Sequence, residues 1–402
     1  MTEGALQGLR VVEYAHMVAG PYCAKLLADL GADVIKVEPP GRGDPARRRG
    51  PFTGKDPARQ HSTLFLYLNT SKRSVTLDIA KATGQDIFRR LAQWADVLIE
   101  DSTPGDMDAL GLGAESLQSL NPRLIVTSVT PFGQTGPYRH YKAYSFQVFH
   151  AGGEGYLMPG KQGAFSRRAP VAAGNHVADY DAALHAAVAT LGAWHARERS
   201  GVGHHVDVSA QEASLSLSRQ EMVSYPNEGM LEHRTTRTHP AIVIRCRDGY
   251  ADIFLLDNRY WDILREMMGD PEWARDERFK DFLSREAHRD ELVRRVEEWS
   301  VNQSADDIYR RGQARQAPFG VYRTPPDLLR SEHLKARRFF TEIAHPEAGA
   351  LPYPSAPYKL SRTPWEARRP APLLGEHNHE VYCGLLGLTP VELVKLHEAR
   401  VV

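Results

Sequence analysis

One carboxylate in the chain stands where a helix is expected to begin, and its position allows two roles. The stretch GNHVADYDAALHAAVATLGAWHARERSGVGHHVDVS runs from Gly174 to Ser209, and Asp179 lies where its apolar helix starts. The plain interpretation is a helix N-cap, which contributes about 1 kcal/mol. The same free N–H groups and helix dipole also keep a partly buried carboxylate ionised, and an oriented carboxylate is a competent nucleophile. Spacing alone favours the cap.

Other patterns that carry chemistry are weak. HNHE, from His377 to Glu380, and the pair His204–His205 match neither HExxH nor a Cys/His finger, so we expect surface histidines and no metal site. The sequence holds neither a GxSxG elbow nor a P-loop. Cys23 falls on the apolar face of a predicted helix, and we interpret it as a core residue.

A loop rich in glycine and proline is the second candidate site. TPFGQTGPY, from Thr130 to Tyr138, follows a predicted strand, and Lys142 and Tyr144 come shortly after it. Open α/β sheets bind ligands at the carboxyl ends of their strands. The loop is therefore either a ligand-binding loop or a purely structural turn.

The elements that must position these residues alternate between strand and helix. A strand at Leu9–Tyr14, a helix closed by Gly31 and a strand at Asp33–Glu38 form a βαβ unit, which implies a parallel sheet. The first turn reads AHMVAGP rather than GxGxxG, which argues against a nicotinamide cofactor. The rhythm continues with a helix at 81–94, strands at 96–100 and 123–129, and the helix after Asp179, for which Leu184, Val188 and Leu191 predict burial.

The texture of the chain changes after Ser209 and suggests a second domain. We expect a large α/β domain over 1–210, a linker over 211–240 and a small α+β domain over 241–325. AIVIRCRDGYADIFLLD predicts two strands around an Asp-Gly turn in the small domain. The proline-rich segment 326–402 is expected to return to the large domain and complete it.

Composition limits the class of partner. The chain has 402 residues, 50 basic and 50 acidic side chains, and 42% hydrophobic residues. A formal net charge of zero gives no electrostatic reason to bind nucleic acid, and no apolar run approaches the roughly 20 residues that span a bilayer. The three cysteines are far apart, and the N-terminal residues lack the pattern of a signal peptide. We expect a cytoplasmic protein.

Five segments, read in order, resemble the class III CoA-transferases, the group that includes formyl-CoA transferase, carnitine CoA-transferase and α-methylacyl-CoA racemase. The resemblance covers essentially the whole chain. It implies a large Rossmann-like α/β domain, a smaller domain, long linkers and an interlocked dimer. The segments are LQGLRVVEYAHMVAGPYCAKLLADLGADVIKVEPPGRGDPAR, LYLNTSKRSVTLDI, ADVLIEDSTPGDMDALGLGAESLQSLNPRLIVTSVTPFGQTGPY, ADYDAALHAAVATLGAWHARERSGVGHHVDVS and APLLGEHNHEVYCGLLGL.

The resemblance implies that Asp179 is the catalytic residue. It attacks a donor acyl-CoA, and the acyl group and CoA then pass through aspartyl anhydride and aspartyl-CoA thioester intermediates to an acceptor carboxylic acid. CoA is a substrate in this scheme, and no cofactor is permanently bound. The residues that the resemblance places along the CoA, together with two assigned by charge alone (Lys72 and Arg73), are Val18, Ala19, Lys72, Arg73, Leu77, Asp78, Asp101, Ser102, Lys142 and Tyr144.

The chain departs from the family pattern at one CoA-proximal motif. Many relatives read Glu-Asn-Phe-Arg-Pro-Gly where this chain has EDSTPG, so Asp101 and Ser102 replace an amide and an aromatic residue. This change leaves open a second hypothesis, in which the chain is a non-catalytic subunit of a heteromeric transferase rather than a homodimeric enzyme. The small domain lacks the run of glycines of formyl-CoA transferase, and LLDNRYW (Leu255–Trp261) stands there instead, so we do not expect formyl-CoA and oxalate as substrates.

A third hypothesis is a 2-methylacyl-CoA racemase, which pairs the same aspartate with a histidine on the opposite face of the α-carbon. The position that resemblance gives to that histidine is Tyr144 here. A tyrosine with an ordinary pKa of about 10 is a poor proton-transfer partner at neutral pH. His140 and His150 could replace it only if the backbone were rearranged. We therefore expect CoA exchange without exchange of the α-proton.

Overall fold

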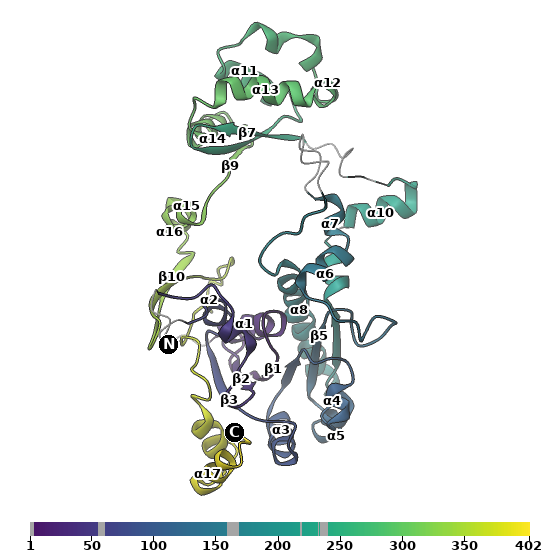
Figure 1. The fold of residues 1–402 in the computed structure, drawn as a ribbon, viewed down its shortest axis with the longest axis vertical. Coiled ribbons are helices and arrows are strands. Elements are labelled where there is room, and N and C mark those ends of the chain that lie inside the picture. The colour runs from purple at the N-terminus through teal and green to yellow at the C-terminus, as the bar shows by residue number, and fades with distance from the viewer. Residues whose placement is uncertain (1–3, 55–60, 159–168, 218, 232, 234–239) are drawn as a thin grey trace. The chain divides into compact units, whose positions relative to one another are not determined.

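The computed structural model describes residues 4–54, 61–158, 169–217, 219–231, 233 and 240–402 (Figure 1). They form two compact units. Unit 1 comprises 1–155, 172–229 and 338–402, and unit 2 comprises 156–171 and 230–337. Much of the expected linker, 211–229, belongs to unit 1, and 232 and 234–239 lie outside the described residues. Among the described residues, no helix is long and apolar enough to cross a membrane.

Unit 1 is built on a parallel sheet of six strands. Their order, β3-β2-β1-β4-β5-β6, reverses direction between β1 and β4. Ligands of open α/β sheets bind at such a switch point, outside the carboxyl ends of the strands. The strands are β1 (Arg10–Tyr14), β2 (Asp33–Glu38), β3 (Lys72–Thr76), β4 (Val97–Glu100), β5 (Ile125–Thr130) and β6 (His205–Ser209).

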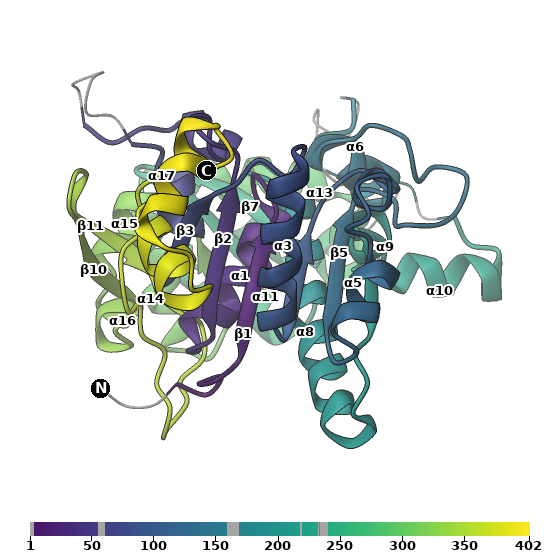
Figure 2. The same cartoon turned by 90° about the horizontal axis from the view of Figure 1, so that it is seen from below.

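The two faces of this sheet bury two separate hydrophobic cores because side chains alternate along a strand. Val11 of β1 packs in one core, and its neighbour Val12 packs in the other. The first core is covered by α1 (Ala19–Asp29), α6 (Ser145–Ala151), α8 (Val177–Ser200) and α9 (Ala210–Leu215). The second is covered by α3 (Ala82–Trp94), α5 (Ala114–Leu120) and α17 (Pro390–Glu398), which lie on the near side of the sheet in Figure 2.

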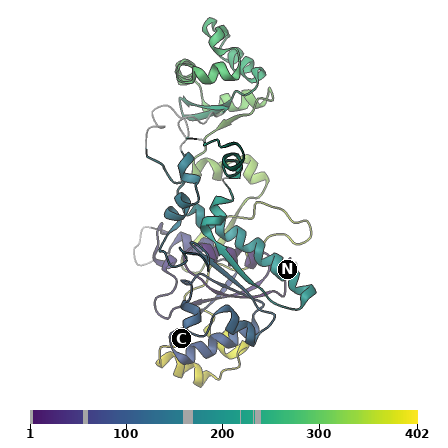
Figure 3. The same cartoon turned by 90° about the vertical axis from the view of Figure 1, so that its right-hand side faces the viewer.

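The long helix α8 is buried along one face only, whereas the sequence predicts a helix buried as a whole. Leu184 is 47% exposed and Val188 is 72% exposed, so the prediction that they are buried is wrong for this chain. The buried stripe consists instead of small side chains, which allow close approach to α1 and the sheet: Ala178, Ala182, Ala183, Ala186, Ala187 and Thr190. In Figure 3, α8 (teal) lies across the sheet from the C-terminal helix (yellow).

The C-terminal segment completes unit 1 along the outer edge of β3. Backbone N–H groups of Ser71 and Asp78 donate to the carbonyls of Arg369 and Val401. The phenol of Tyr382 donates to the Thr76 carbonyl at 2.6 Å. An edge strand that would otherwise expose unpaired backbone groups is thereby covered. The remaining elements of unit 1 are α2 (Thr63–Leu68), α4 (Asp106–Ala109), α10 (Arg219–Glu228), β10 (Phe340–His345) and β11 (Gly349–Pro354).

Unit 2 has its own core around an antiparallel sheet ordered β7-β8-β9. The hairpin β7 (Ala241–Cys246) and β8 (Gly249–Phe254) forms around the predicted Asp-Gly turn. Buried apolar side chains from the sheet and its helices include Trp261 and Phe279. The other elements are β9 (Phe319–Val321), α11 (Asn258–Met267), α12 (Phe282–Ala287), α13 (Arg289–Ser300), α14 (Ala305–Gln313), α15 (Pro325–Arg330) and α16 (Glu332–Ala336); α7 (Glu154–Leu157) lies at the boundary of the two units.

Candidate active site at the carboxyl edge of the large sheet

Three of the residue pairs expected to line CoA follow parallel strands of the same sheet. Val18–Ala19 comes after β1, Leu77–Asp78 after β3 and Asp101–Ser102 after β4. The carboxyl ends of parallel strands meet at one edge of a sheet, and this edge includes the switch point between β1 and β4. Residues separated by more than 80 positions in sequence are thus brought to one edge.

The turn after β1 is held by carboxylates from two other loops. The N–H of Met17 donates to Asp44 Oδ1 at 3.0 Å, and the N–H of His16 donates to Asp101 Oδ2 at 2.7 Å. Met17 has a φ of 58°, a left-handed conformation that is costly for a side chain of this size. The two hydrogen bonds fix this turn immediately before Val18, which is buried, and before the first residue of α1, Ala19.

His16 is a residue that the sequence interpretation missed. Its ring Nδ1 donates to Asp101 Oδ1 at 3.1 Å, so one carboxylate accepts from both the ring and the backbone of the same residue. Burial opposes protonation of the ring, but the hydrogen bond and charge of Asp101 outweigh it, so the pKa of His16 is raised above 6.5. Ser102 turns its backbone inward and donates its N–H to Glu100 Oε2 at 2.8 Å.

The turn after β3 is shaped by the C-terminal segment. Leu77 is buried in the second core, and its N–H donates to the Glu38 carbonyl. The Asp78 N–H donates to the Val401 carbonyl at 2.8 Å, and the Asp78 carboxylate accepts the N–H of Ala80 at 3.1 Å. Asp78 therefore contributes a half-exposed carboxylate whose backbone is fixed from both sides.

Lys72 and Arg73 are not brought to this edge, which corrects their assignment as phosphate partners by charge. Both lie at the amino end of β3. Lys72 is fully buried, and its Nζ lies 2.7 Å from Glu13 Oε2. Arg73 pairs with Asp33 Oδ2 at 2.6 Å and with Glu380 Oε1 at 2.9 Å. Both cations serve ion pairs within the protein.

A buried charge network underneath the first turn was also missed by the sequence interpretation. Lys36 Nζ lies 2.7 Å from Glu13 Oε1 and 2.8 Å from Asp44 Oδ2, and it donates to the carbonyl of Ala15 at 2.9 Å. Asp44 is fully buried, and although burial raises the pKa of a carboxyl group, Lys36 and two backbone N–H groups lower the pKa of Asp44 to about 2. Alternating hydrophobicity does not signal such a network, because Lys36 occupies a strand position that is normally apolar.

Asp179 lies in the first turn of α8, but it is not the N-cap. The N-cap is His176, and Asp179 occupies the third helical position. The ring Nδ1 of His176 donates to Asp179 Oδ2 at 3.1 Å, and the Asp179 side chain keeps 23% of its surface exposed. The capping interpretation is therefore wrong, and the carboxylate is both oriented by a histidine and accessible. The three-residue spacing from His176 to Asp179 was the signal available in the sequence.

The backbone that leads into α8 is strained. Asn175 and His176 have φ values of 64° and 62°, two consecutive left-handed residues without a glycine. Such conformations cost about 1–3 kcal/mol each and persist where the surrounding structure demands them, often at functional sites. Here they direct the His176 ring toward Asp179 and leave the first N–H groups of α8 facing the start of the helix.

The starts of α1 and α8 pack against each other. The ring of Tyr180 meets the ring of Tyr22 edge-on, with centroids 4.8 Å apart. Ala19 of α1 and Val177 of α8 pack on the same core. The residue next to Asp179 is therefore in contact with the first turn of α1, which follows the Val18–Ala19 turn.

The loop after β5 extends the same neighbourhood. Ala143 packs on the core that also holds Ala19 and Val177, and it lies between the two expected CoA residues Lys142 and Tyr144. Both of these side chains are exposed, Tyr144 to 83%, and the Tyr144 N–H donates to Gln147 Oε1 at 3.0 Å. Ala143 is thus held by the core that the starts of α1 and α8 also cover, and its two neighbours are exposed.

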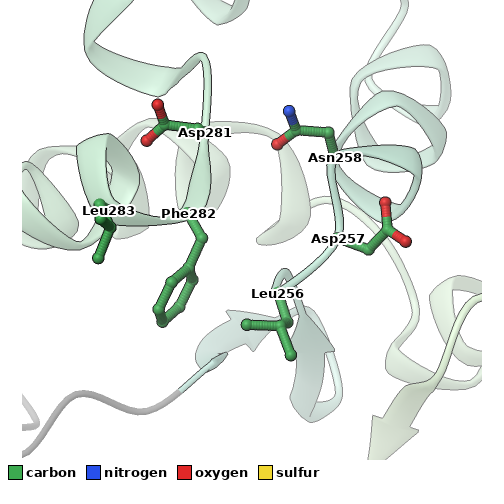
Figure 4. Close-up of a pocket in the computed structure, with 6 residues that line it drawn as sticks. All are labelled: Leu256, Asp257, Asn258, Asp281, Phe282 and Leu283. Atoms are coloured by element: carbon green, nitrogen blue, oxygen red, sulfur yellow. The ribbon is translucent and has the colours of Figure 1, made fainter.

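Unit 2 carries an open hollow on its surface, between the turn after β8 and the start of α12 (Figure 4). Asp257 and Asp281 cap α11 and α12, and Asn258 lies between them in the view, with the apolar side chains of Phe282 and Leu256 below. The hollow falls within and beside LLDNRYW, the stretch that stands in place of a glycine-rich loop. Its lining residues are Leu256, Asp257, Asn258, Asp281, Phe282 and Leu283.

Comparison with known proteins identifies the family. The sequence profile of CoA-transferase family III matches residues 6–378. The chain belongs to CoA-transferase family III. The members of this family in the comparison are named as CoA-transferases, so the chain is an enzyme of that class.

Three curated relatives match over nearly their whole length. The succinyl-CoA–D-citramalate CoA-transferase of Chloroflexus aurantiacus is 34% identical over 99% of this chain and 98% of its own. The formyl-CoA:oxalate CoA-transferase of Streptomyces coelicolor is 31% identical over 100% of both chains. The succinyl-CoA–L-malate CoA-transferase beta subunit of C. aurantiacus is 32% identical over 99% of this chain and 98% of its own.

A solved structure agrees with this assignment. A CAIB/BAIF family protein from Brucella suis superposes with a TM-score of 0.87 at 31% identity, covering 96% of this chain and 100% of its own. The Brucella suis protein and this chain therefore share the α/β fold described above.

Proposed function

We propose that the chain transfers CoA from an acyl-CoA donor to a free carboxylic acid, with Asp179 as the nucleophile. The observation that carries this proposal is the Asp179 carboxylate itself, which is partly exposed, oriented by His176 at 3.1 Å and next in sequence to Tyr180, whose ring packs against Tyr22 of α1. Family membership supplies CoA thioesters as substrates.

The proposed reaction has four balanced steps. Asp179 attacks the donor thioester carbonyl, the C–S bond breaks, and CoA leaves as a thiolate from a mixed anhydride. The thiolate attacks the aspartyl carbonyl, which releases the donor acid and leaves an aspartyl-CoA thioester. The acceptor carboxylate displaces the thiolate from this thioester and forms a second anhydride. The thiolate then attacks the acceptor carbonyl, which yields the new acyl-CoA and regenerates the Asp179 carboxylate.

A carboxylate nucleophile suits this exchange because its anhydride stays as activated as the thioester. The first-turn N–H groups and the positive end of the α8 dipole lie on the side of the helix start where this carboxylate is placed. His176 limits the rotation of the carboxylate, which raises the fraction of attack-ready geometry. Water must be excluded while the anhydride exists, since hydrolysis would waste the donor.

We propose that CoA lies along the edge formed by Val18–Ala19, Leu77–Asp78 and Asp101–Ser102, with Lys142 and Tyr144 as further contacts. The order of these pairs across β1, β3 and β4 supports one continuous binding edge that ends near Asp179. For the acids we propose dicarboxylates, because relatives over the full length are named for succinyl-CoA with D-citramalate or L-malate.

We further propose that two copies of the chain form the interlocked dimer that the resemblance implies. Leu184 and Val188 are exposed apolar side chains of α8. They support the proposal that another chain covers this face of the helix. Both lie on the same helix as Asp179, so assembly and the active site would share one element.

The test is chemical trapping of the intermediate. Purified enzyme is incubated with succinyl-CoA and no acceptor and then treated with hydroxylamine, which converts an aspartyl thioester or anhydride into a hydroxamate. Peptide mass spectrometry should find the hydroxamate on Asp179. Asp179→Asn should show neither the adduct nor exchange with D-citramalate, L-malate or oxalate. An adduct on another residue, or near-wild-type turnover by Asp179→Asn, would contradict the proposal.

A racemase is disfavoured by the surroundings of the histidines. His176 is in direct contact with Asp179 and leaves no room for an α-carbon between them. The ring of His150 packs edge-on against Phe146, and His140 accepts a hydrogen bond from Arg139 at 2.9 Å. Incubation with a 2-methylacyl-CoA in heavy water should leave the α-hydrogen in place.

The non-catalytic subunit is the other alternative, and the name of one relative as a beta subunit keeps it relevant. The orientation of Asp179 favours an active chain. The purified chain alone should exchange CoA, whereas activity that requires a second, different chain would favour the subunit hypothesis.

A further inference from the structure

We propose that His16 and Asp101 form a titratable pair that sets the affinity for CoA, so that CoA binds most tightly when His16 is protonated. This inference rests on the proposed binding of CoA along the carboxyl edge of the sheet. It assigns to this pair a role in the pH dependence of binding.

The pair lies at the switch point of the sheet. His16 follows β1 and Asp101 follows β4, the two strands at which the strand order reverses. Their side chains are 30% and 17% exposed, so they are shielded from bulk water yet reachable from the edge. Charge at such a position acts on a ligand through less water than charge on an open surface does.

The geometry of the pair survives loss of the proton. Asp101 accepts from the His16 backbone at 2.7 Å and from ring Nδ1 at 3.1 Å. A neutral imidazole that keeps its Nδ1 proton still donates to the same oxygen. Deprotonation therefore changes the charge of the pair from zero to minus one without requiring any movement of the turn.

Other charged groups face His16 without cancelling this effect. Lys36 lowers the pKa of His16 and Asp44 raises it, and these two are paired with each other at 2.8 Å. The ring of Tyr14 meets the His16 ring edge-on at 5.6 Å. Asp101 is the partner in direct contact, so the charge of the pair depends mainly on His16.

The carboxyl edge around His16 is rich in carboxylates, so the positive charge of a protonated His16 matters for the binding of an anionic ligand. Burial, followed by the charges of Asp101, Asp78, Asp106 and Glu100, raises the pKa of Tyr14 to about 12. CoA carries a diphosphate and a phosphate monoester, which these carboxylates repel. A protonated His16 offsets Asp101, and a neutral His16 adds its uncompensated charge to the repulsion.

The direction of the pH effect on CoA affinity follows from the raised pKa of His16. Below 6.5 the ring is protonated and CoA affinity is highest, and affinity falls as the pH rises through the raised value. By reciprocity, bound CoA must raise the pKa of His16 further. One unit charge at the distance of a neighbouring phosphate corresponds to a change in Kd of about three- to tenfold.

The experiment is a calorimetric titration of free coenzyme A between pH 5.5 and 9 into four proteins: wild type, Asp101→Asn, His16→Gln and the double variant. The titration of the ligand's own phosphate is common to all four. The wild-type Kd should rise about three- to tenfold across the range relative to the double variant, which retains neither titratable group of the pair. Asp101→Asn and the double variant should stay tight at high pH, and His16→Gln should be weak at every pH.

A second measurement does not depend on CoA binding by a variant. The His16 ring is titrated by NMR in wild-type protein, and its resonance is assigned by its absence from the His16→Gln spectrum or, failing that, by selective labelling. Its pKa should rise when coenzyme A is added. An unchanged pKa, or a variant Asp101→Asn with the wild-type pH profile, would overturn the inference and leave CoA binding itself intact. Absence of coenzyme A binding to wild type at any pH would overturn the proposed function as well.

Discussion

Asp179 and His176 illustrate what the residue scale adds to the sequence. The position of Asp179 near a helix start could be predicted from the apolar pattern that follows it, but its role could not. Which residue caps the helix depends on two left-handed backbone conformations, at Asn175 and His176. Asparagine and histidine adopt this conformation more often than most residues, but their presence in the sequence does not show that both do so here. His16 and Asp101 were missed as partners because 85 positions separate them, and only the sheet order brings them together.

The contact from His176 to Asp179 predicts a defect in rate rather than in binding. His176→Ala should lower kcat about ten- to a hundredfold, with little change in KM for the acyl-CoA, because the carboxylate loses its orientation. His176→Asn is the matched control, since asparagine tolerates a positive φ and keeps a side-chain N–H donor. Steady-state kinetics with both variants is the measurement. A rise in KM alone, equal in both, would contradict the orienting role.

The burial of Lys72 predicts a defect in stability. Lys72→Met leaves Glu13 with one ionic partner fewer in a dry interior and should lower the free energy of unfolding by about 3–5 kcal/mol. Adding Glu13→Gln should recover part of this loss, because the variants then remove both members of the pair. Urea unfolding monitored by circular dichroism provides the values. A loss below about 1 kcal/mol in Lys72→Met would show that the network relaxes or hydrates.

At the scale of elements, the positions and order of the strands follow from the sequence more reliably than the burial of each helix face does. The β2 strand was predicted at Asp33–Glu38, where it lies, because the preceding Gly31 and the β-branched residues Val34, Ile35 and Val37 mark it. The burial of α8 was overestimated because Leu184, Val188 and Leu191 recur at helical spacing among alanines. The helix instead presses its alanines against α1 and the sheet, where larger side chains would not fit.

This close packing predicts that the same substitution has different effects on stability at the buried and the exposed face of α8. Ala186→Leu, on the fully buried face, should destabilise the fold by about 1–3 kcal/mol through overpacking. Ala189→Leu, the same change on the exposed face, should stay within about 0.5 kcal/mol. Thermal or urea unfolding of the two variants compares them directly. Equal effects would mean that the buried face is loosely packed.

At the scale of the whole molecule, the two units differ in how their chain segments are arranged. Unit 2 carries an independent core with Trp261 and Phe279, and most of it comes from a continuous stretch. Unit 1 combines segments from both sides of that stretch. The sequence predicted a return of the C-terminal segment, but not that its final residues bind the turn after β3, since single backbone hydrogen bonds leave no pattern in side chains.

The separate core predicts that the small unit folds alone. A fragment of residues 240–324 should unfold in a single cooperative transition, because its buried cluster lies within that range. Near-ultraviolet circular dichroism of its tryptophans during heating is the readout. A featureless spectrum with no transition would mean that this unit depends on the rest of the chain.

The proposed dimer predicts a mass that does not depend on dilution. Interlocked chains cannot separate without unfolding, so sedimentation should give twice the chain mass even at nanomolar concentration. Leu184→Lys combined with Val188→Lys should prevent correct assembly, because both side chains are exposed on one helix face. Leu283→Lys, on an exposed residue of unit 2, is the control. A monomeric wild-type protein would contradict the proposal.

The closure of β3 by the C-terminal segment has a consequence for synthesis on the ribosome. Residues 10–209 supply every strand of the large sheet, but its outer edge stays unpaired until 369–402 have emerged. The small unit can fold in the interval. The large sheet meanwhile has an unpaired edge strand, β3, which can pair with other nascent chains. During synthesis the large unit therefore begins to fold first and finishes last. The turn at Leu77–Asp78 takes its final shape only after Val401 has been synthesised.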